Sequence, residues 1–326
     1  MFEYITGGGL AAESLPLALA REAEVMLNAQ LRDLAERPLK ILRDRRLPMP
    51  AAFRHCRAAE ILPVGEGKRD FASTWQTALD WAEMVWVTAP ETGGLLAELS
   101  GQVLKAGKKL LGSHPRAVAL AGDKLATLHK LAQAKVECVP VWPLGDFTGQ
   151  VPSPWVVKPR DGVGCEGVVL VQDQAALDAF PRDWLLQPFI LGDAMSLSAI
   201  FAGGESVLLS ANRQIVQNRS GSFHLLGCEV NAFPSLDRRW HKLCDRIATA
   251  IPELWGYVGI DLIMTAKGAL VLEINPRLTL SYAGLSSALG ESIGAWIVDL
   301  AKGEMSLSEI SRRRSKIIGR QVWVGA

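Results

Sequence analysis

The residues best suited to chemistry are Asp261 and Glu273, two acidic side chains inside otherwise apolar stretches. Each stretch predicts a strand, and Ala266-Lys267-Gly268, with Gly268 left-handed, is the predicted loop between them. Asp261 and Glu273 then stand directly opposite each other, where like charges are destabilising unless a cation binds between them. Asn275 shares their face, because side chains in a strand alternate. The sequence therefore predicts a metal site made of Asp261, Glu273 and Asn275.

Three oxygen ligands suit Mg²⁺, or Mn²⁺, held jointly with nucleotide phosphates. The alternative, two solvent-facing acids, fits the apolar flanks less well. Arg277 follows directly, and Arg213 stands at the end of another predicted strand, at residues 206–211. Fixed guanidinium groups hold a transferring phosphoryl group or a substrate carboxylate. The pattern favours such a catalytic function for Arg277 and leaves Arg213 evenly balanced between this function and none.

A second feature is the loop formed by Gly162, Gly164 and Gly167, which together match GxGxxG. A dinucleotide-binding fingerprint requires a helix after this loop, whereas Val168 to Val171 is a β-branched run that predicts a strand. A strand, a glycine loop and a strand describe a flap whose backbone N–H groups could close over nucleotide phosphates. A plain glycine-rich hairpin is the alternative for the loop taken alone.

Two lysines strengthen the nucleotide hypothesis. Lys158 ends the strand before the flap, where a cation meets phosphate oxygens, and Lys124 lies in a predicted helix from which it could supply a second cation. A solvated helix lysine is the alternative for Lys124. The segment from Gln187 to Asp193 predicts a hinge whose backbone binds an adenine edge, with Asp193 either accepting from ribose hydroxyls or serving as a turn residue.

These residues need a scaffold, and the chain supplies an α/β pattern in three parts. Strand, turn and helix signals alternate over residues 1–112. The turn residues Gly112-Ser113-His114-Pro115 then mark a boundary in this pattern. Strand signals dominate from residue 136, and residues 283–300 are helical in pattern. We expect an α/β protein with lobes at 1–112, 113–190 and 191–326.

Composition limits the remaining function classes. The 326 residues carry 35 Lys and Arg against 34 Asp and Glu, so no basic excess favours nucleic acid or a membrane surface, and Arg312-Arg313-Arg314 is interpreted as a solvated helix end. Neither a secretory signal nor an apolar span is expected, which predicts a cytoplasmic protein. Five dispersed cysteines and five histidines show no metal-ligand spacing.

The order of Lys124, Lys158 with its flap, the hinge, Asp261 and the segment 272–277 resembles the ATP-grasp superfamily of carboxylate–amine ligases over about residues 113–290. The resemblance implies an N-terminal pre-ATP-grasp α/β lobe at 1–112, a small lid lobe at 113–190 and a larger C-terminal lobe at 191–326. It also implies that ATP and Mg²⁺ activate a small-molecule carboxylate as an acyl phosphate, which an amine captures.

Residues 2–9 and 275–279 are, within that superfamily, most like the tyramine–glutamate ligases of methanofuran-type cofactor synthesis. This narrower resemblance implies the glutamate side chain as the acid and tyramine as the amine, with Tyr4 and the Gly7-Gly8-Gly9 turn near the amine. An ATP-binding regulatory protein and an ATP-dependent carboxylase are the alternatives. No nucleic acid or membrane partner is expected, and a homo-oligomer is left open.

Overall fold

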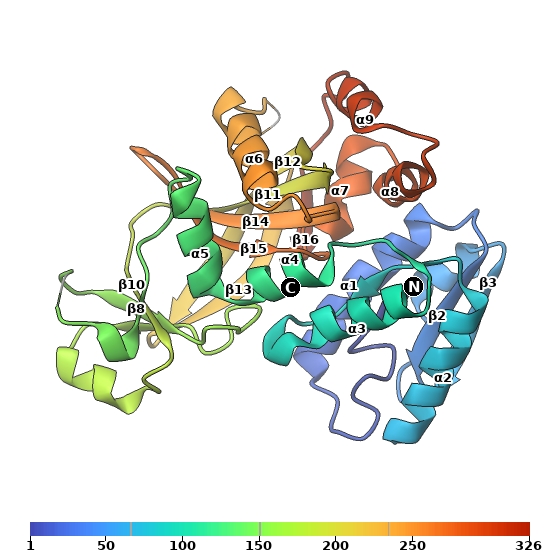
Figure 1. Cartoon of the computed structure of the whole chain (residues 1–326), viewed down its shortest axis with the longest axis horizontal. Coiled ribbons are helices and arrows are strands. Elements are labelled where there is room, and N and C mark those ends of the chain that lie inside the picture. The colour runs from blue at the N-terminus through green and yellow to red at the C-terminus, as the bar shows by residue number, and fades with distance from the viewer. Residues whose placement is uncertain (66, 150, 234) are drawn as a thin grey trace.

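The computed structural model describes residues 1–65, 67–149, 151–233 and 235–326. Figure 1 shows an N-terminal lobe, in blue, beside a large sheet whose far end carries β8 and β10. Helices and strands mix in this arrangement, which confirms the predicted α/β class.

The N-terminal lobe is built on short parallel strands with three helices around them. Its hydrophobic core is supplied by helix residues at helical spacing, such as Trp75 and Leu79 on one helix and Leu99 and Val103 on another. The pairs of strands are β1 (Phe2–Glu3) with β5 (Val87–Thr88), β2 (Leu39–Asp44) with β3 (Ala59–Val64), and β4 (Met84–Val85) with β6 (Lys109–Leu110). The helices are α1 (Leu17–Asp33), α2 (Lys68–Trp81) and α3 (Leu95–Lys105).

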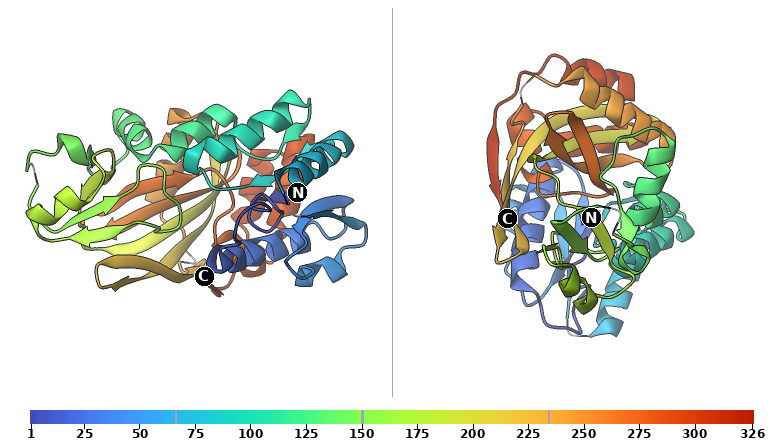
Figure 2. Two further views of the ribbon diagram at one scale, coloured as in Figure 1. Left: turned by 90° about the horizontal axis from the view of Figure 1, so that it is seen from below. Right: turned by 90° about the vertical axis from the view of Figure 1, so that its left-hand side faces the viewer.

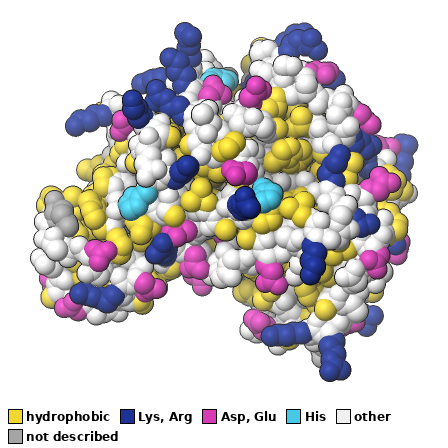
Figure 3. Space-filling view, in the orientation of Figure 1, with side chains coloured by type: hydrophobic (Ala, Val, Ile, Leu, Met, Phe, Trp, Pro, Cys, Tyr) yellow, Lys and Arg dark blue, Asp and Glu magenta, His cyan; other side chains and the backbone are white. Residues whose placement is uncertain are grey.

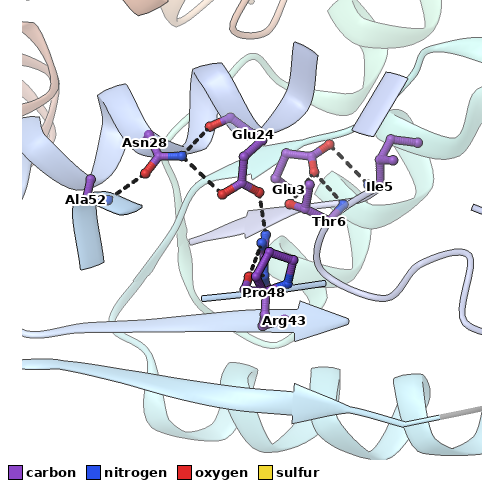
Figure 4. Close-up of polar contacts among 8 residues, drawn as sticks. All are labelled: Glu3, Ile5, Thr6, Glu24, Asn28, Arg43, Pro48 and Ala52. Atoms are coloured by element: carbon purple, nitrogen blue, oxygen red, sulfur yellow. Dashed lines mark hydrogen bonds and ion pairs between the residues drawn. The ribbon is translucent and has the colours of Figure 1, made fainter. Parts of the chain in front are cut away.

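The strand β1 ends at Glu3, although the strand signal in the sequence covers residues 2–6. The buried carboxylate of Glu3 accepts hydrogen bonds from the backbone N–H of Ile5, at 3.1 Å, and from the N–H and hydroxyl of Thr6, at 2.7 and 2.6 Å (Figure 4). These bonds curl the chain into turns directly after Glu3. A Cβ at Gly9 would overlap the Tyr4 ring, so the glycine turn is packed against its own lobe.

A 10-stranded antiparallel sheet forms the rest of the scaffold, with α4 and α5 along one face (Figure 2). Its order is β15-β14-β11-β12-β13-β9-β8-β10-β7, and β16 pairs with β13. The strands are β7 (Trp142–Pro143), β8 (Trp155–Lys158), β9 (Val169–Val171), β10 (Leu185–Pro188), β11 (Asp193–Ala202), β12 (Glu205–Arg219), β13 (Ser222–Val230), β14 (Gly256–Thr265), β15 (Gly268–Asn275) and β16 (Val322–Gly325). The helices of this part are α4 (Pro115–Gly122), α5 (Lys124–Gln133) and α6 (Arg238–Ala250).

Strand alternation gives the central strands two different faces. In β14, Val258, Ile260 and Leu262 are buried in the core that includes residues of α4, α5 and α6. Asp261 and Ile263, the intervening residues, face a cavity on the other side. The sheet therefore presents polar residues to one side because its apolar residues pack against helices on the other.

In the C-terminal segment, the predicted helical stretch at 283–300 forms two helices, α7 (Tyr282–Leu289) and α8 (Ile293–Lys302), and a third helix, α9 (Leu307–Arg314), follows it. Gly290, at φ +72°, ends α7. The prediction that Arg314 is solvated is wrong, because its side chain is buried and donates to the backbone carbonyls of Leu209 and Ile317.

Helix α1 joins the N-terminal lobe to this segment. The carboxylate of Asp33 accepts hydrogen bonds from the hydroxyls of Tyr282, at 2.6 Å, and Ser286, at 2.8 Å, and from the backbone N–H of Gly294, at 2.9 Å. Apolar residues of α1, α7 and α8 also share one core. The lobe boundaries at residues 112 and 190 remain predictions.

None of the described helices is long and apolar enough to cross a bilayer. Figure 3 shows acidic and basic side chains interspersed over one face, with Lys and Arg gathered at the top, where α6 lies. The exposed basic residues of α6 are Arg238, Arg239, Lys242 and Arg246.

Candidate functional site

A cavity of about 550 Å³ lies between the sheet, the glycine loop, the segment after β10 and α1. It brings together ten of the twelve residues predicted as site residues and leaves out Gly167 and Arg213. The ten are Lys124, Lys158, Gly162, Gly164, Gln187, Asp193, Asp261, Glu273, Asn275 and Arg277. Segments far apart in the sequence therefore converge on one space, as a shared ligand requires.

Asp261 and Glu273 lie opposite each other as the sequence predicts, although the loop between their strands differs from the predicted one. Asp261 pairs with Glu273 across β14 and β15. The loop between the strands has two residues, Ala266 and Lys267, and not three, because Gly268 already pairs with Thr265. A β-bulge at the step from Asp261 to Leu262 then restores the predicted register.

Hydrogen bonds hold the Asp261 carboxylate in place. It accepts from Gln214 Nε2 at 2.9 Å and from Asn275 Nδ2 at 3.0 Å. Burial and the neighbouring Glu273 raise the pKa of Asp261 above its ordinary value. Burial alone would also raise the pKa of Glu273, but the charges of Lys124 and Lys158 outweigh it and lower this pKa.

This donor set fits a divalent hard cation. Two half-buried carboxylates face each other, and turning the Asn275 amide over would direct its oxygen to the same point. The described residues contain no cluster of three or more His, Cys, Asp or Glu able to cage a metal. Most ligands must then come from a bound molecule or water, which is how Mg²⁺ is usually bound beside phosphates.

The two predicted lysines reach the same place from different elements. Asp123 caps the N-terminus of α5, which places Lys124 on the first turn with its ammonium 3.4 Å from Glu273 Oε2 and donating to the carbonyl of Gly162. Lys158, at the end of β8, is 6% exposed. Burial lowers the pKa of Lys158 to about 8, against the opposing effect of Glu273.

We expect ATP binding to weaken as the pH rises through about 8. A pKa lowered to about 8 means that Lys158 is charged below this pH and neutral above it, and only the charged form attracts phosphate. The KM for ATP, measured between pH 6.5 and 9.5, should therefore rise above pH 8. Lys158→Arg, which stays charged throughout, should flatten this profile; an equal rise in both proteins would contradict the assignment.

The glycine loop joins β8 and β9, two antiparallel strands, and is a flap as predicted. Gly164 and Cys165 have φ angles of +63° and +64°, and the N–H of Glu166 bonds the carbonyl of Val163, which closes a tight turn. Gly167, at φ +70°, does not line the cavity because it packs against Pro159 at the base of the loop. Its role is in shaping the flap.

The flap also contacts the N-terminal lobe. Thr92 Oγ1 donates to the carbonyl of Asp161 at 2.9 Å, and the N–H of Gly93 donates to its carboxylate at 3.0 Å. Arg160 forms two hydrogen bonds to Asp123, at 2.8 and 2.6 Å. These contacts fix the start of the flap.

Nucleotide should protect the flap tip. If the backbone N–H groups of residues 163–166 bind phosphates, their hydrogen exchange should slow about tenfold or more when ATP and Mg²⁺ are added. The segment 172–178, outside the cavity lining, serves as an internal control. Unchanged exchange at residues 163–166 under saturating ATP would show that the flap does not bind phosphates.

The predicted hinge leads from β10 into β11 and lines the cavity along its length. Gln187 is buried, and its Nε2 donates to the carbonyl of Val139 at 3.5 Å. A Cβ on Gly192 would lie 2.5 Å from the carbonyl oxygen of Met264, so only glycine fits here. Asp193 begins β11 opposite Met264 and faces the cavity.

The two arginines differ. Arg277 is largely buried, and its Nε donates to Glu91 at 2.9 Å while its Nη1 donates to the carbonyl of Leu278 at 3.1 Å. Arg213 is absent from the cavity lining, because alternation in β12 turns its neighbour Gln214 toward Asp261. Arg213 pairs instead with Glu229 at 2.6 Å, so its predicted catalytic contact is not supported.

Several site residues carry no sequence signal of their own. Glu91 and Glu22 come from the N-terminal lobe, and each looks like an ordinary surface acid in its segment. Gln214 could have been found by extending the predicted strand at 206–211 and following its alternation. The Gly7-Gly8-Gly9 turn and Tyr4, expected near a substrate, do not line the cavity.

Family comparisons agree with this geometry. A family model described as an ATP-grasp domain matches residues 121–281, and one described as a pre ATP-grasp 3 domain matches residues 39–118. The chain belongs to the ATP-grasp family. The predicted fold and the resemblance to ATP-grasp carboxylate–amine ligases are thereby confirmed.

Two proteins and one solved structure illustrate what the chain is similar to. The tyramine–L-glutamate ligase of Methanocaldococcus jannaschii is 26% identical over 289 residues, which are 88% of this chain and 84% of that protein. A probable alpha-L-glutamate ligase of Stenotrophomonas maltophilia is 31% identical over 194 residues, 54% of this chain and 64% of that protein. The crystal structure of an ATP-grasp superfamily protein from Archaeoglobus fulgidus matches with a TM-score of 0.66 and 23% identity, covering 93% and 86% of the chains, which shows the fold.

Proposed function

We propose that this ATP-grasp protein is an ATP-dependent carbon–nitrogen ligase that joins the side-chain carboxylate of glutamate to a primary aromatic amine such as tyramine, in methanofuran-type cofactor synthesis. The observation that carries the proposal is the convergence of the Asp261–Glu273 pair, two lysines and Arg277 on one cavity. Relatives named as ligases of glutamate support the acid, and the relative from Methanocaldococcus jannaschii supports the amine.

Most of the predicted site residues have a task in this reaction. Lys124, Lys158 and the flap N–H groups would hold the phosphates of ATP, and the hinge would hold its base. Asp261, Glu273 and Asn275 would bind Mg²⁺, which neutralises phosphate charge. Arg277 would hold a glutamate carboxylate through Nη2, the nitrogen left by its bonds to Glu91 and Leu278.

The chemistry proposed is a transfer followed by a capture. A carboxylate oxygen attacks the γ-phosphorus of ATP, the bond to the β-phosphate oxygen breaks, and ADP leaves with an acyl phosphate formed. The neutral amine then attacks the acyl carbon, phosphate leaves, and the amine loses a proton. The protein supplies position and charge rather than a covalent nucleophile.

A direct assay tests the substrates. Purified protein is incubated with ATP, Mg²⁺, glutamate and tyramine, and ADP and the amide are measured by mass spectrometry. ADP with the amide supports the proposal. Amide formation from another acid and amine alone would retain the ligase and discard this pair, and ADP release that requires only bicarbonate would favour a carboxylase.

A further inference from the structure

A carboxylate of the N-terminal lobe lines the cavity and has no task in the reaction described above. Glu22 lies on α1 of the N-terminal lobe and lines the cavity with Arg277. Within the described residues it accepts no hydrogen bond and forms no ion pair, although it and Arg277 interact electrostatically. Burial makes an unpaired carboxylate costly, so a ligand that brings a positive charge to Glu22 would be stabilised.

The helix that carries Glu22 is firmly held. Two residues further along α1, Glu24 pairs with the buried Arg43 at 2.7 Å, and Asn28 accepts from the N–H of Ala52 at 2.6 Å (Figure 4). At the end of the helix, Asp33 bonds the C-terminal segment. The backbone of Glu22 therefore has a fixed place relative to the cavity.

The positively charged guanidinium group of Arg277 is also held in a fixed place. Arg277 donates hydrogen bonds from Nε to Glu91 and from Nη1 to the carbonyl of Leu278. Its Nη2 donates no hydrogen bond within the described part of the chain. Glu22 and Arg277 thus place an anion and a cation beside the same space without pairing to each other. An α-amino acid carries an ammonium and a carboxylate on one carbon and matches such a separated pair.

We propose that Glu22 binds the ammonium group, and Arg277 the α-carboxylate, of the amino acid that is ligated, so that Glu22 selects acids bearing an α-amino group. This proposal rests on the ligase function proposed above and names the residue that sets its acid specificity. The side-chain carboxylate, at the far end of the substrate, is then left free to react.

Glutamate and glutarate provide the test, because they differ in the α-amino group alone. The wild type should use glutamate at least tenfold more efficiently than glutarate. Glu22→Gln should raise the KM for glutamate roughly tenfold to a hundredfold, the loss expected for a charged hydrogen bond. It should leave the KM for ATP unchanged and should not lower the activity with glutarate. Glu36→Gln, an exposed residue just beyond α1, is the matched control, and thermal unfolding checks that each variant folds.

Three outcomes would overturn the inference. They are an unchanged preference for glutamate in Glu22→Gln, an effect on the KM of the amine alone, and a wild type that does not distinguish glutamate from glutarate. If the wild type ligates another amino acid instead, glutamate is discarded as the substrate, and the same comparison with that amino acid and its deamino analogue decides the role of Glu22. If no acid is ligated, calorimetric titration decides: tighter binding of glutamate than glutarate, lost in Glu22→Gln, supports the role, and its absence refutes it.

Discussion

Glu273→Ala is expected to reduce ATP-dependent turnover at least about a thousandfold while the protein stays folded. Glu273 stands opposite Asp261 and 3.4 Å from the ammonium of Lys124, so it contacts both the proposed metal position and a proposed phosphate ligand. Its removal leaves one carboxylate at the metal position. It relieves the repulsion with Asp261 but also removes the ion-pair partner of Lys124, so the melting temperature should fall only modestly.

Turnover is measured as ADP release at saturating Mg²⁺, with thermal unfolding as the check on folding. Glu205→Ala, an exposed glutamate at the start of β12, is the matched control and should keep full activity. Activity of Glu273→Ala within a few-fold of wild type would show that the metal is bound elsewhere.

Arg277→Lys is expected to lower kcat/KM for the acid roughly a hundredfold, although the charge is kept. The guanidinium of Arg277 bonds Glu91 and the carbonyl of Leu278 and has a further nitrogen for substrate, whereas an ammonium group on a flexible chain cannot hold all three positions. Losing one charged hydrogen bond costs about 3 kcal/mol at most, which corresponds to this factor.

Arg213→Lys is the comparison that makes this result specific. Arg213 lies outside the cavity and forms a partly exposed ion pair with Glu229, so the substitution should change kcat/KM by less than about twofold. Steady-state kinetics with the acid varied measures both variants. Equal losses in the two would mean that the cavity does not bind the acid through Arg277.

The hairpin of β14 and β15 could be predicted because local rules determine it. Alternation and a short turn place Asp261 opposite Glu273, and the apolar flanks show that both strands are buried. The predicted pairing of Asp261 with Glu273 is correct although the predicted loop is one residue too long, because the bulge beside Asp261 compensates for the shorter turn. Lys158 and the flap followed from the same kind of local reasoning.

Contacts between distant segments were beyond local reasoning. Glu22 and Glu91 look like solvated acids until the N-terminal lobe packs on the sheet and buries them. The strand β13 was not predicted, because Ser222–Val230 lacks clean alternation and contains Gly227 at φ +153°. Arg213 was misplaced because its strand extends to Arg219 and its face is set by neighbouring strands.

Transfer of oxygen from the acid to phosphate tests the central claim most directly. The reaction is run with glutamate whose side-chain carboxylate carries ¹⁸O, together with ATP, Mg²⁺ and tyramine. Because the carboxylate oxygen attacks the γ-phosphorus, each phosphate released should carry one ¹⁸O atom, and the amide should retain the other. Unlabelled phosphate formed alongside the amide would contradict activation of the carboxylate by ATP.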